Sequence, residues 1–143
     1  MSDEPLRPDP DRLLQHTAAP HRGKLKVFFG ACAGVGKTWA MLAEAQRLRA
    51  QGLDILIGVA ETHGRKETAA MLQGLSTLPP RRLAHRGRYV YEFDLDAALA
   101  RRPALILVDE LAHSNAPGSR HPKRWQDVDE LLEAGIDVFT TVN

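Results

Sequence analysis

A short glycine-rich segment, Ala-Cys-Ala-Gly-Val-Gly-Lys-Thr at residues 31–38, constrains the fold of this chain more than any other feature. It follows the largely apolar run Leu25–Phe29. It leads into residues 38–50, where apolar side chains recur at the spacing of an amphipathic helix. A strand, a tight turn and a helix in this order are typical of α/β proteins. The segment therefore predicts an α/β fold from its first element onward.

The same segment resembles a Walker A phosphate-binding loop, with Ala31 in place of the usual first glycine. Backbone N–H groups of such a turn and the positive end of the following helix face the same phosphates. The Lys37 ammonium would reach the β- and γ-phosphates, and the Thr38 hydroxyl would hold Mg²⁺. The residues expected to bind the phosphates are Gly34, Val35, Gly36, Lys37 and Thr38. The alternative is an ordinary glycine-rich turn with a surface lysine.

The rest of the chain continues the alternation of strands and helices. The expected strands are 24–29, 53–60, 104–109 and 136–142, and the expected helices are 38–50, 67–75, 94–102 and 123–134. Residues 81–93 are assigned no more than a short strand at 89–92. In the last helix, Trp125, Val128 and Leu132 are expected to share one face. The alternation predicts a P-loop NTPase-like three-layer sandwich with a mostly parallel sheet.

A second acidic motif supports the nucleotide site. The apolar strand at 104–109 ends in Asp109, and Glu110 follows directly, which resembles a Walker B strand. The Asp109 carboxylate would coordinate Mg²⁺, and Glu110 would act as a general base toward a nucleophile. An acid after an apolar strand is weak evidence alone, but it gains weight after a phosphate loop. Both motifs lie where parallel strands end, the edge at which α/β sheets bind ligands.

Further polar residues are expected at that edge with less certain roles. The loop that contains His113, Asn115 and Arg120 is either a switch that senses the γ-phosphate or a solvated connection, and spacing alone favours the connection. Arg120 or Arg124 is a hypothetical arginine finger acting on a second molecule. The remaining candidates at this edge are His63, Arg65, Thr141 and Asn143.

Composition limits the classes of partner. The formal net charge of +1 gives no electrostatic case for nucleic acid or lipid, although arginines cluster locally at 81–88 and 120–124. The single cysteine excludes an intramolecular disulfide. No apolar run suits a membrane span and no signal peptide opens the chain, so a cytoplasmic location is expected. Residues 1–22, with four prolines, predict a mobile arm before a single domain at 23–143.

Several stretches together carry a family resemblance. They are RPDPDRLL at 7–14, the phosphate loop, ETHGR at 61–65, VDELAHSNAPGSRHPKRWQDV at 108–128 and AGIDVFTTVN at 134–143. These stretches resemble the amino-terminal cytoplasmic domain of the KdpD family of potassium-responsive sensor histidine kinases, over essentially the whole chain.

The resemblance implies an ATP-binding sensor domain of an osmosensitive two-component kinase in the bacterial inner membrane, which controls a high-affinity potassium pump. ATP and Mg²⁺ are the implied cofactors. The remainder of the kinase and its dimer mate are the implied partners. No transmitter with a phosphoacceptor histidine is found, so we expect a fragment that is truncated at its carboxyl end and is no histidine kinase by itself.

Three functions therefore remain open. The first is a regulatory ATP-binding module. The second is a catalytic P-loop enzyme, either an ATPase or a protein-hydroxyl phosphotransferase, which would use Asp109 and Glu110. The third is a protein-binding surface at the basic loop 118–124, with the nucleotide as a structural plug.

Overall fold

The computed structural model describes residues 21–30 and 36–142. Four sequence predictions lie outside these residues: the arm up to residue 20, Gly34 and Val35 of the phosphate loop, and Asn143. Gly36, which directly precedes the helix that follows this loop, and Lys37, the first residue of that helix, are described.

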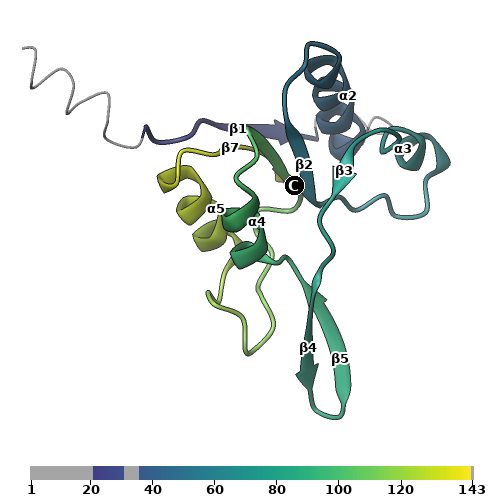
Figure 1. Ribbon diagram of the computed structural model, residues 1–143. Helices are drawn as coiled ribbons and strands as arrows, with labels where there is room; N and C mark the ends of the chain where they lie inside the picture. The colour runs from purple at the N-terminus through teal and green to yellow at the C-terminus, as the bar shows by residue number, and fades with distance from the viewer. Residues whose placement is uncertain (1–20, 31–35, 143) are drawn as a thin grey trace, which may run out of the picture.

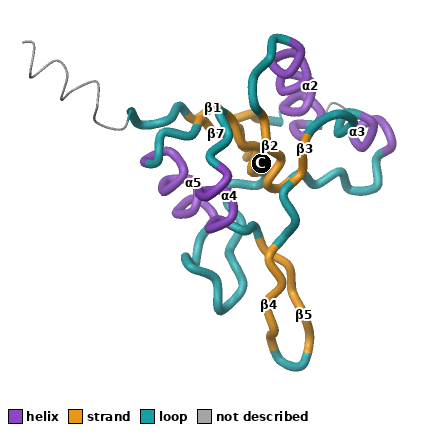
Figure 2. Tube along the Cα trace, in the orientation of Figure 1, coloured by secondary structure: helices purple, strands orange, loops and turns teal. Residues whose placement is uncertain are grey.

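Five strands form one sheet in the order β1-β7-β6-β2-β3, and every neighbouring pair is parallel. Their bounds are Leu25–Phe29 (β1), Ile55–Val59 (β2), Ser76–Thr77 (β3), Leu105–Val108 (β6) and Asp137–Val142 (β7). The helices are Lys37–Ala50 (α2), Lys66–Ala70 (α3), Leu95–Arg101 (α4) and Arg124–Glu133 (α5). The predicted α/β class with a mostly parallel sheet is confirmed (Figures 1 and 2).

The sheet is covered on both faces, because successive residues of a strand point to opposite sides. Leu105 and Leu107 of β6 pack in a cluster with Met41, Leu42 and Ala45 of α2. Ile106 and Val108 instead join a second cluster built on α4 and α5, which includes Leu95, Ala98, Val128 and Leu131. The two clusters give three layers, with α2 and the segment after α3 on one side and α4 and α5 on the other.

Local signals place several element ends where they were predicted. The α2 helix is followed by Gly52 in the left-handed region, at φ +92°. The Asp94 side chain caps α4 by accepting a hydrogen bond from the Ala97 N–H at 3.1 Å. Among the described residues, no helix is both long and apolar enough to cross a membrane.

The predicted helix at 67–75 was too long. The α3 helix ends at Ala70, and residues 71–74 form turns in which N–H groups bond to carbonyls three residues back, as from Met71 to Thr68. Gly74, at φ +83°, then reverses the chain so that Ser76–Thr77 can pair with β2 as an edge strand.

Residues 81–93 form more than the one short strand that was predicted. Arg81–His85 (β4) and Arg88–Glu92 (β5) pair as an antiparallel hairpin separate from the main sheet, and Figure 1 shows it projecting from the body. The prediction that Trp125, Val128 and Leu132 share one face of α5 is also wrong in part. Val128 and Leu132 are buried, but the Trp125 side chain is exposed.

Candidate functional site

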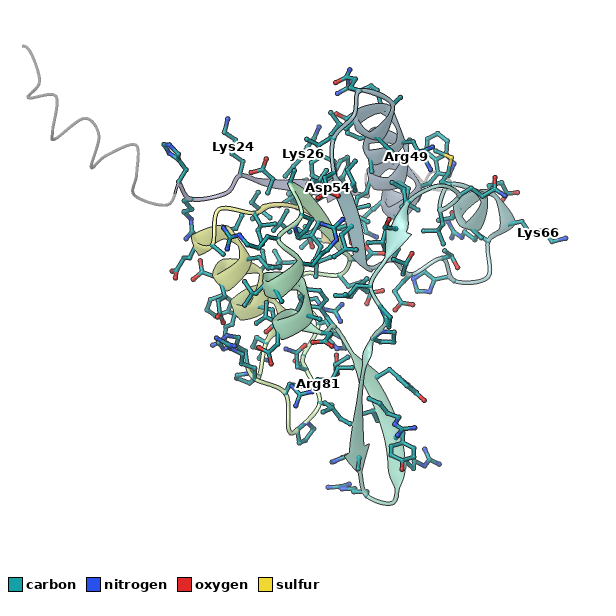
Figure 3. The ribbon with its side chains drawn as sticks, in the orientation of Figure 1. Lys24, Lys26, Arg49, Asp54, Lys66 and Arg81 are labelled. Atoms are coloured by element: carbon teal, nitrogen blue, oxygen red, sulfur yellow. The ribbon has the colours of Figure 1, made fainter. Side chains whose placement is uncertain are left out.

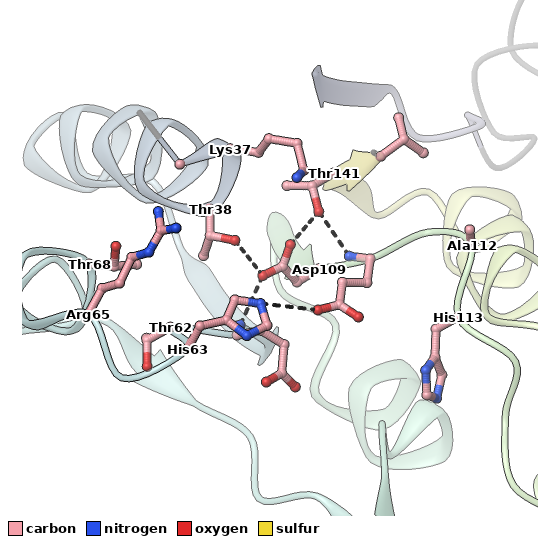
Figure 4. Close-up of a pocket in the computed structure, with 14 residues that line it drawn as sticks. Lys37, Thr38, Thr62, His63, Arg65, Thr68, Asp109, Ala112, His113 and Thr141 are labelled. Carbon is pink, nitrogen blue, oxygen red and sulfur yellow. Dashed lines mark hydrogen bonds and ion pairs between the residues drawn. The ribbon is translucent and has the colours of Figure 1, made fainter. Parts of the chain in front are cut away.

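A cavity of about 560 Å³ opens at the carboxyl ends of the central strands. Its walls come from the start of α2, the loop after β2, the beginning of α3, the loop after β6 and the end of β7 (Figure 4). The sequence-predicted residues that line it are Gly36, Lys37, Thr38, His63, Arg65, Asp109, Glu110, His113 and Thr141. The fold thus brings residues from distant parts of the chain around one space.

Asp109 lies at the centre of this arrangement and is fully buried. Its Oδ2 accepts hydrogen bonds from the Thr38 hydroxyl at 2.8 Å and from the Glu61 N–H at 2.9 Å. Its Oδ1 accepts a hydrogen bond from the Thr141 hydroxyl. Three donors from three different segments therefore hold one carboxylate in place, as the dashed lines of Figure 4 show for several of these contacts.

Glu110 adopts a backbone conformation that is unusual for a residue other than glycine, at φ +62°. Its N–H donates to the Thr141 Oγ1 at 3.0 Å, and the next N–H, from Leu111, donates to the Thr141 carbonyl at 2.9 Å. These two bonds stabilise the turn. The Glu110 side chain is 40% exposed, and its Oε2 lies 3.7 Å from the His63 Nε2 across the cavity. A positive φ at such a place is a common feature of functional sites.

Arg124, the first residue of α5, lies behind the acidic pair and is 5% exposed. Its Nη1 donates to the Asp109 carbonyl at 2.8 Å, and its Nη2 lies 3.7 Å from the Glu92 Oε1. Burial lowers the pKa of the Arg124 guanidinium, and the carboxylates of Glu92, Glu110 and Asp127 oppose that shift. Because it is buried, Arg124 cannot be the predicted arginine finger toward a second molecule.

His113 connects the cavity to the root of the hairpin. Its Nε2 lies 2.9 Å from the Oε1 of Glu92, the last residue of β5. The other carboxylate oxygen of Glu92 accepts a hydrogen bond from the Ala116 N–H at 2.7 Å. The loop after β6 is therefore anchored at two points and is no freely solvated connection.

Asn115 and Arg120 lie outside the cavity. The Asn115 Nδ2 donates to the Asp127 Oδ2 at 3.0 Å. The Arg120 guanidinium donates to Asp96 at 2.6 Å and also to Glu130. With Arg124 buried as well, two cations of the basic segment 118–124 are engaged within the domain.

Two residues of this network were missed from the sequence. Glu92 holds His113, and the Glu61 N–H holds Asp109. A backbone N–H leaves no sequence signal. Glu92 has a sequence signal, because it is the only acidic residue between positions 68 and 93. In the described part of the chain, no group of three or more His, Cys, Asp or Glu side chains forms a metal site by itself.

Comparison with known families decides the identity of the domain. Residues 21–143 match the family model described as KdpD, the osmosensitive K⁺ channel His kinase sensor domain. This chain belongs to the KdpD sensor-domain family. The match spans the whole described structure. The cavity, with Asp109 and Glu110 in its wall, therefore lies within the matched KdpD domain.

Individual KdpD relatives agree with this. The chain is 85% identical over its full length to the sensor protein KdpD of Escherichia coli. Over 92% of its length it is 51% identical to the sensor protein KdpD of Mycobacterium tuberculosis and 54% identical to a putative sensor protein KdpD of a Synechocystis species. It spans only 16%, 15% and 36% of these three proteins, respectively.

Proposed function

We propose that this chain is the ATP-binding regulatory domain of a two-component, potassium-responsive sensor histidine kinase, built on a P-loop NTPase-like fold. The observation that carries the proposal is the 2.8 Å hydrogen bond between the Thr38 hydroxyl and the Asp109 carboxylate. It joins the end of the segment that resembles a Walker A loop to the end of the strand that resembles Walker B, in the wall of a cavity of about 560 Å³. A cavity of this size suits a small-molecule ligand.

The donor set fits a nucleotide with magnesium. Mg²⁺ prefers oxygen ligands and is commonly held by one or two carboxylates together with phosphates and water. The Thr38 hydroxyl and the Asp109 carboxylate are the oxygens that would hold it, and the ion would neutralise phosphate charge. Lys37 stands at the first turn of α2, where the helix dipole favours anions. Arg65 adds a second cation to the cavity wall.

A regulatory role follows from the contacts behind the cavity. The Asp109 carbonyl accepts from Arg124, and Glu92 holds both His113 and Ala116. A ligand that contacts Asp109 or His113 would thereby bias the positions of α5 and of the hairpin. The domain would report nucleotide occupancy to the remainder of the kinase and its dimer mate. The relatives' names support the sensor role. We further propose that the longer protein to which this domain belongs is a kinase of the inner membrane and that it controls a high-affinity potassium pump.

Calorimetric titration of the purified chain with MgATP tests the proposal. We expect Lys37→Ala to weaken MgATP binding by about 1.5–3 kcal/mol, because charged hydrogen bonds contribute that much. This corresponds to roughly a ten- to hundredfold rise in Kd. Lys66→Ala is the matched control, since the Lys66 side chain points away from the body in Figure 3 and does not line the cavity. Equal affinities for wild type and Lys37→Ala would refute the phosphate site.

A second candidate function is catalysis, as a slow ATPase or a protein-hydroxyl phosphotransferase. Glu110 favours it specifically, because a pure sensor needs no base, yet this carboxylate faces the cavity from a backbone held at φ +62°. If it is a general base, Glu110→Gln should lower ATP turnover by about 10²–10⁴-fold while leaving MgATP affinity nearly unchanged. Glu67→Gln removes an exposed carboxylate outside the cavity wall and should retain turnover. Absence of turnover in the wild type would leave the regulatory function alone.

A further inference from the structure

The β4–β5 hairpin is a structurally separate element. Its two strands pair only with each other, and the turn between them consists of Arg86 at φ +51° and Gly87 at φ +75°. Two positive φ values in a two-residue loop form the tight turn that matches the twist of a hairpin. The base of the hairpin is fixed in the core by Phe93, which is 6% exposed, and by the contacts of Glu92. The rest projects into solvent (Figure 1).

Uncompensated positive charge distinguishes this hairpin from the rest of the domain. It carries Arg81, Arg82, Arg86 and Arg88, and no acidic residue before Glu92. Several arginines elsewhere pair with carboxylates of the same domain, as in Arg47–Glu44 and Arg101–Asp54. Within the described residues, none of the four hairpin arginines forms such an ion pair.

One face of the hairpin combines one of these arginines, Arg82, with exposed aromatic rings. Directly opposed residues share a face, so the pairs Arg82–Tyr91 and Ala84–Tyr89 lie together. Tyr89 and Tyr91 are 60% and 62% exposed. The Arg82 guanidinium carbon lies 4.2 Å from the centre of the Tyr89 ring. Tyrosine and arginine are the residues that contribute most to protein–protein interfaces, because they bury much surface and still form hydrogen bonds.

We infer that the tyrosine–arginine face of this hairpin docks onto an acidic surface in another part of the same sensor protein. Charge complementarity favours an acidic partner, because Arg82 lies on this face and Arg86 lies in the adjoining turn, and neither forms an ion pair with a described residue. The chain spans 16% of its Escherichia coli relative, so most of such a protein lies outside it and is available for contact. A hairpin of two strands is also marginally stable alone, and a partner surface would stabilise it. The exposed rings and charge of the hairpin support this docking independently of any nucleotide binding in the cavity.

Other partners fit the surface less well. In a second copy of the domain, the carboxylates of Asp54, Asp96, Asp129 and Glu130 are already paired with its own arginines. A membrane surface calls for large apolar side chains that insert, and the hairpin tip is Arg86-Gly87. Nucleic-acid-binding domains are typically strongly basic, whereas this chain has a net charge of +1.

Photo-crosslinking within a longer protein tests the inference. In the protein used, this chain replaces the matching segment of the Escherichia coli relative. Photoreactive benzoylphenylalanine is then introduced in place of Tyr91, so that an aromatic side chain is retained at this position. The same photoreactive residue at Trp125, 54% exposed on α5, is the positional control. We expect mass spectrometry to find the Tyr91 position linked to a segment rich in Asp and Glu elsewhere in the same protein, and the Trp125 position not linked to it.

Paired charge removal tests the role of the arginines. Arg82→Ala with Arg86→Asn removes the charge of this face and of the adjoining turn, and asparagine tolerates the positive φ of residue 86. The double change should lower the crosslink yield about tenfold, because complementary charge governs such encounters. Arg47→Ala with Arg101→Ala removes the same charge from arginines that are already paired, and should leave the yield unchanged. Equal melting temperatures establish that both variants fold. Links from Tyr91 only to lipid, to RNA or to the second copy, no link at all, or a yield insensitive to the hairpin arginines would overturn the inference.

Discussion

Among single residues, two glycines lie where neighbouring segments leave no room for a side chain. A Cβ on Gly23 would lie 2.0 Å from the Ile136 carbonyl oxygen, which is backbone and cannot rotate away. A Cβ on Gly58 would lie 2.6 Å from the Phe93 ring. Gly58 stands where the register between β2 and β6 shifts, so the missing side chain leaves room for that ring. In both positions glycine is required by space.

Gly23→Ala should therefore destabilise the domain by about 1–3 kcal/mol, the usual range for forcing an extra carbon into a packed site. The Gly23 N–H also donates to the Leu132 carbonyl at 2.7 Å, and displacement of the backbone would weaken this bond. Urea unfolding measures the change. Lys24→Ala, at an exposed neighbouring side chain, should stay within about 0.5 kcal/mol of wild type. A Gly23→Ala variant as stable as wild type would show that β1 can shift freely.

Among the elements, α5 carries the most unusual electrostatics. Its first turn buries two ionisable side chains, Arg124 and Asp127. Burial raises the pKa of the Asp127 carboxyl above its ordinary value of 3.8, against the opposing effects of Asn115, His121 and Arg124. The start of α5 therefore holds a carboxylate that ionises less readily in the folded domain than in the unfolded chain.

The sign of the resulting pH dependence follows directly. Between pH 3.8 and its raised pKa, Asp127 binds its proton more tightly in the folded state than in the unfolded state. Its contribution to the free energy of unfolding therefore falls as pH rises through this interval. Asp127→Asn cannot ionise and lacks this contribution. As pH rises above 3.8, wild type should lose stability relative to Asp127→Asn until the carboxyl is ionised in the folded state as well.

Urea unfolding of both proteins over this pH range measures the difference. A stability difference that stays constant with pH would contradict the shift of the Asp127 pKa. Asp54→Asn is a suitable control, because the neighbouring Arg101 lowers the pKa of that exposed carboxyl. The Asp54 contribution to the free energy of unfolding should therefore stay constant above pH 3.8 and be lost only as pH falls below this value.

In the whole molecule, strand order assembles the site. The β7 strand lies between β1 and β6, so Thr141 at its end reaches both Asp109 and Glu110. The start of α2 and the end of β6 meet at the same edge through Thr38 and Asp109. A ligand in this cavity would therefore link segments from opposite ends of the chain and stabilise the fold as a unit.

MgATP should accordingly raise the melting temperature of the wild-type domain. At a ligand concentration a hundred times Kd, binding stabilises the folded state by about 2.7 kcal/mol, roughly 10 °C for a domain of this size. Lys37→Ala should show a much smaller rise at the same concentration, and Lys66→Ala the full one. Differential scanning fluorimetry gives all three values. Equal rises for the two variants would indicate binding elsewhere on the surface.

Much of the fold was predictable because its signals are local. The Asp94 cap, Gly52 after α2 and the apolar strand before Asp109 each act within a few residues of where they lie. The hairpin was only partly predicted, because its strands are mostly exposed and only Leu83 and Val90 give an apolar alternation. The α3 helix was predicted too long, because apolar residues after Ala70 contribute to the core from turns.

The candidate site divides in the same way. Local sequence was sufficient to place Thr38 in the first turn of a helix and the acidic pair directly after a buried strand. The partners of those residues depend on contacts between segments far apart in the chain. The burial of Arg124, the attachment of His113 to Glu92 and the pairing of Arg120 with Asp96 come from packing α5 and the hairpin against the sheet. No periodicity records such contacts, because their free energy exists only once distant surfaces meet.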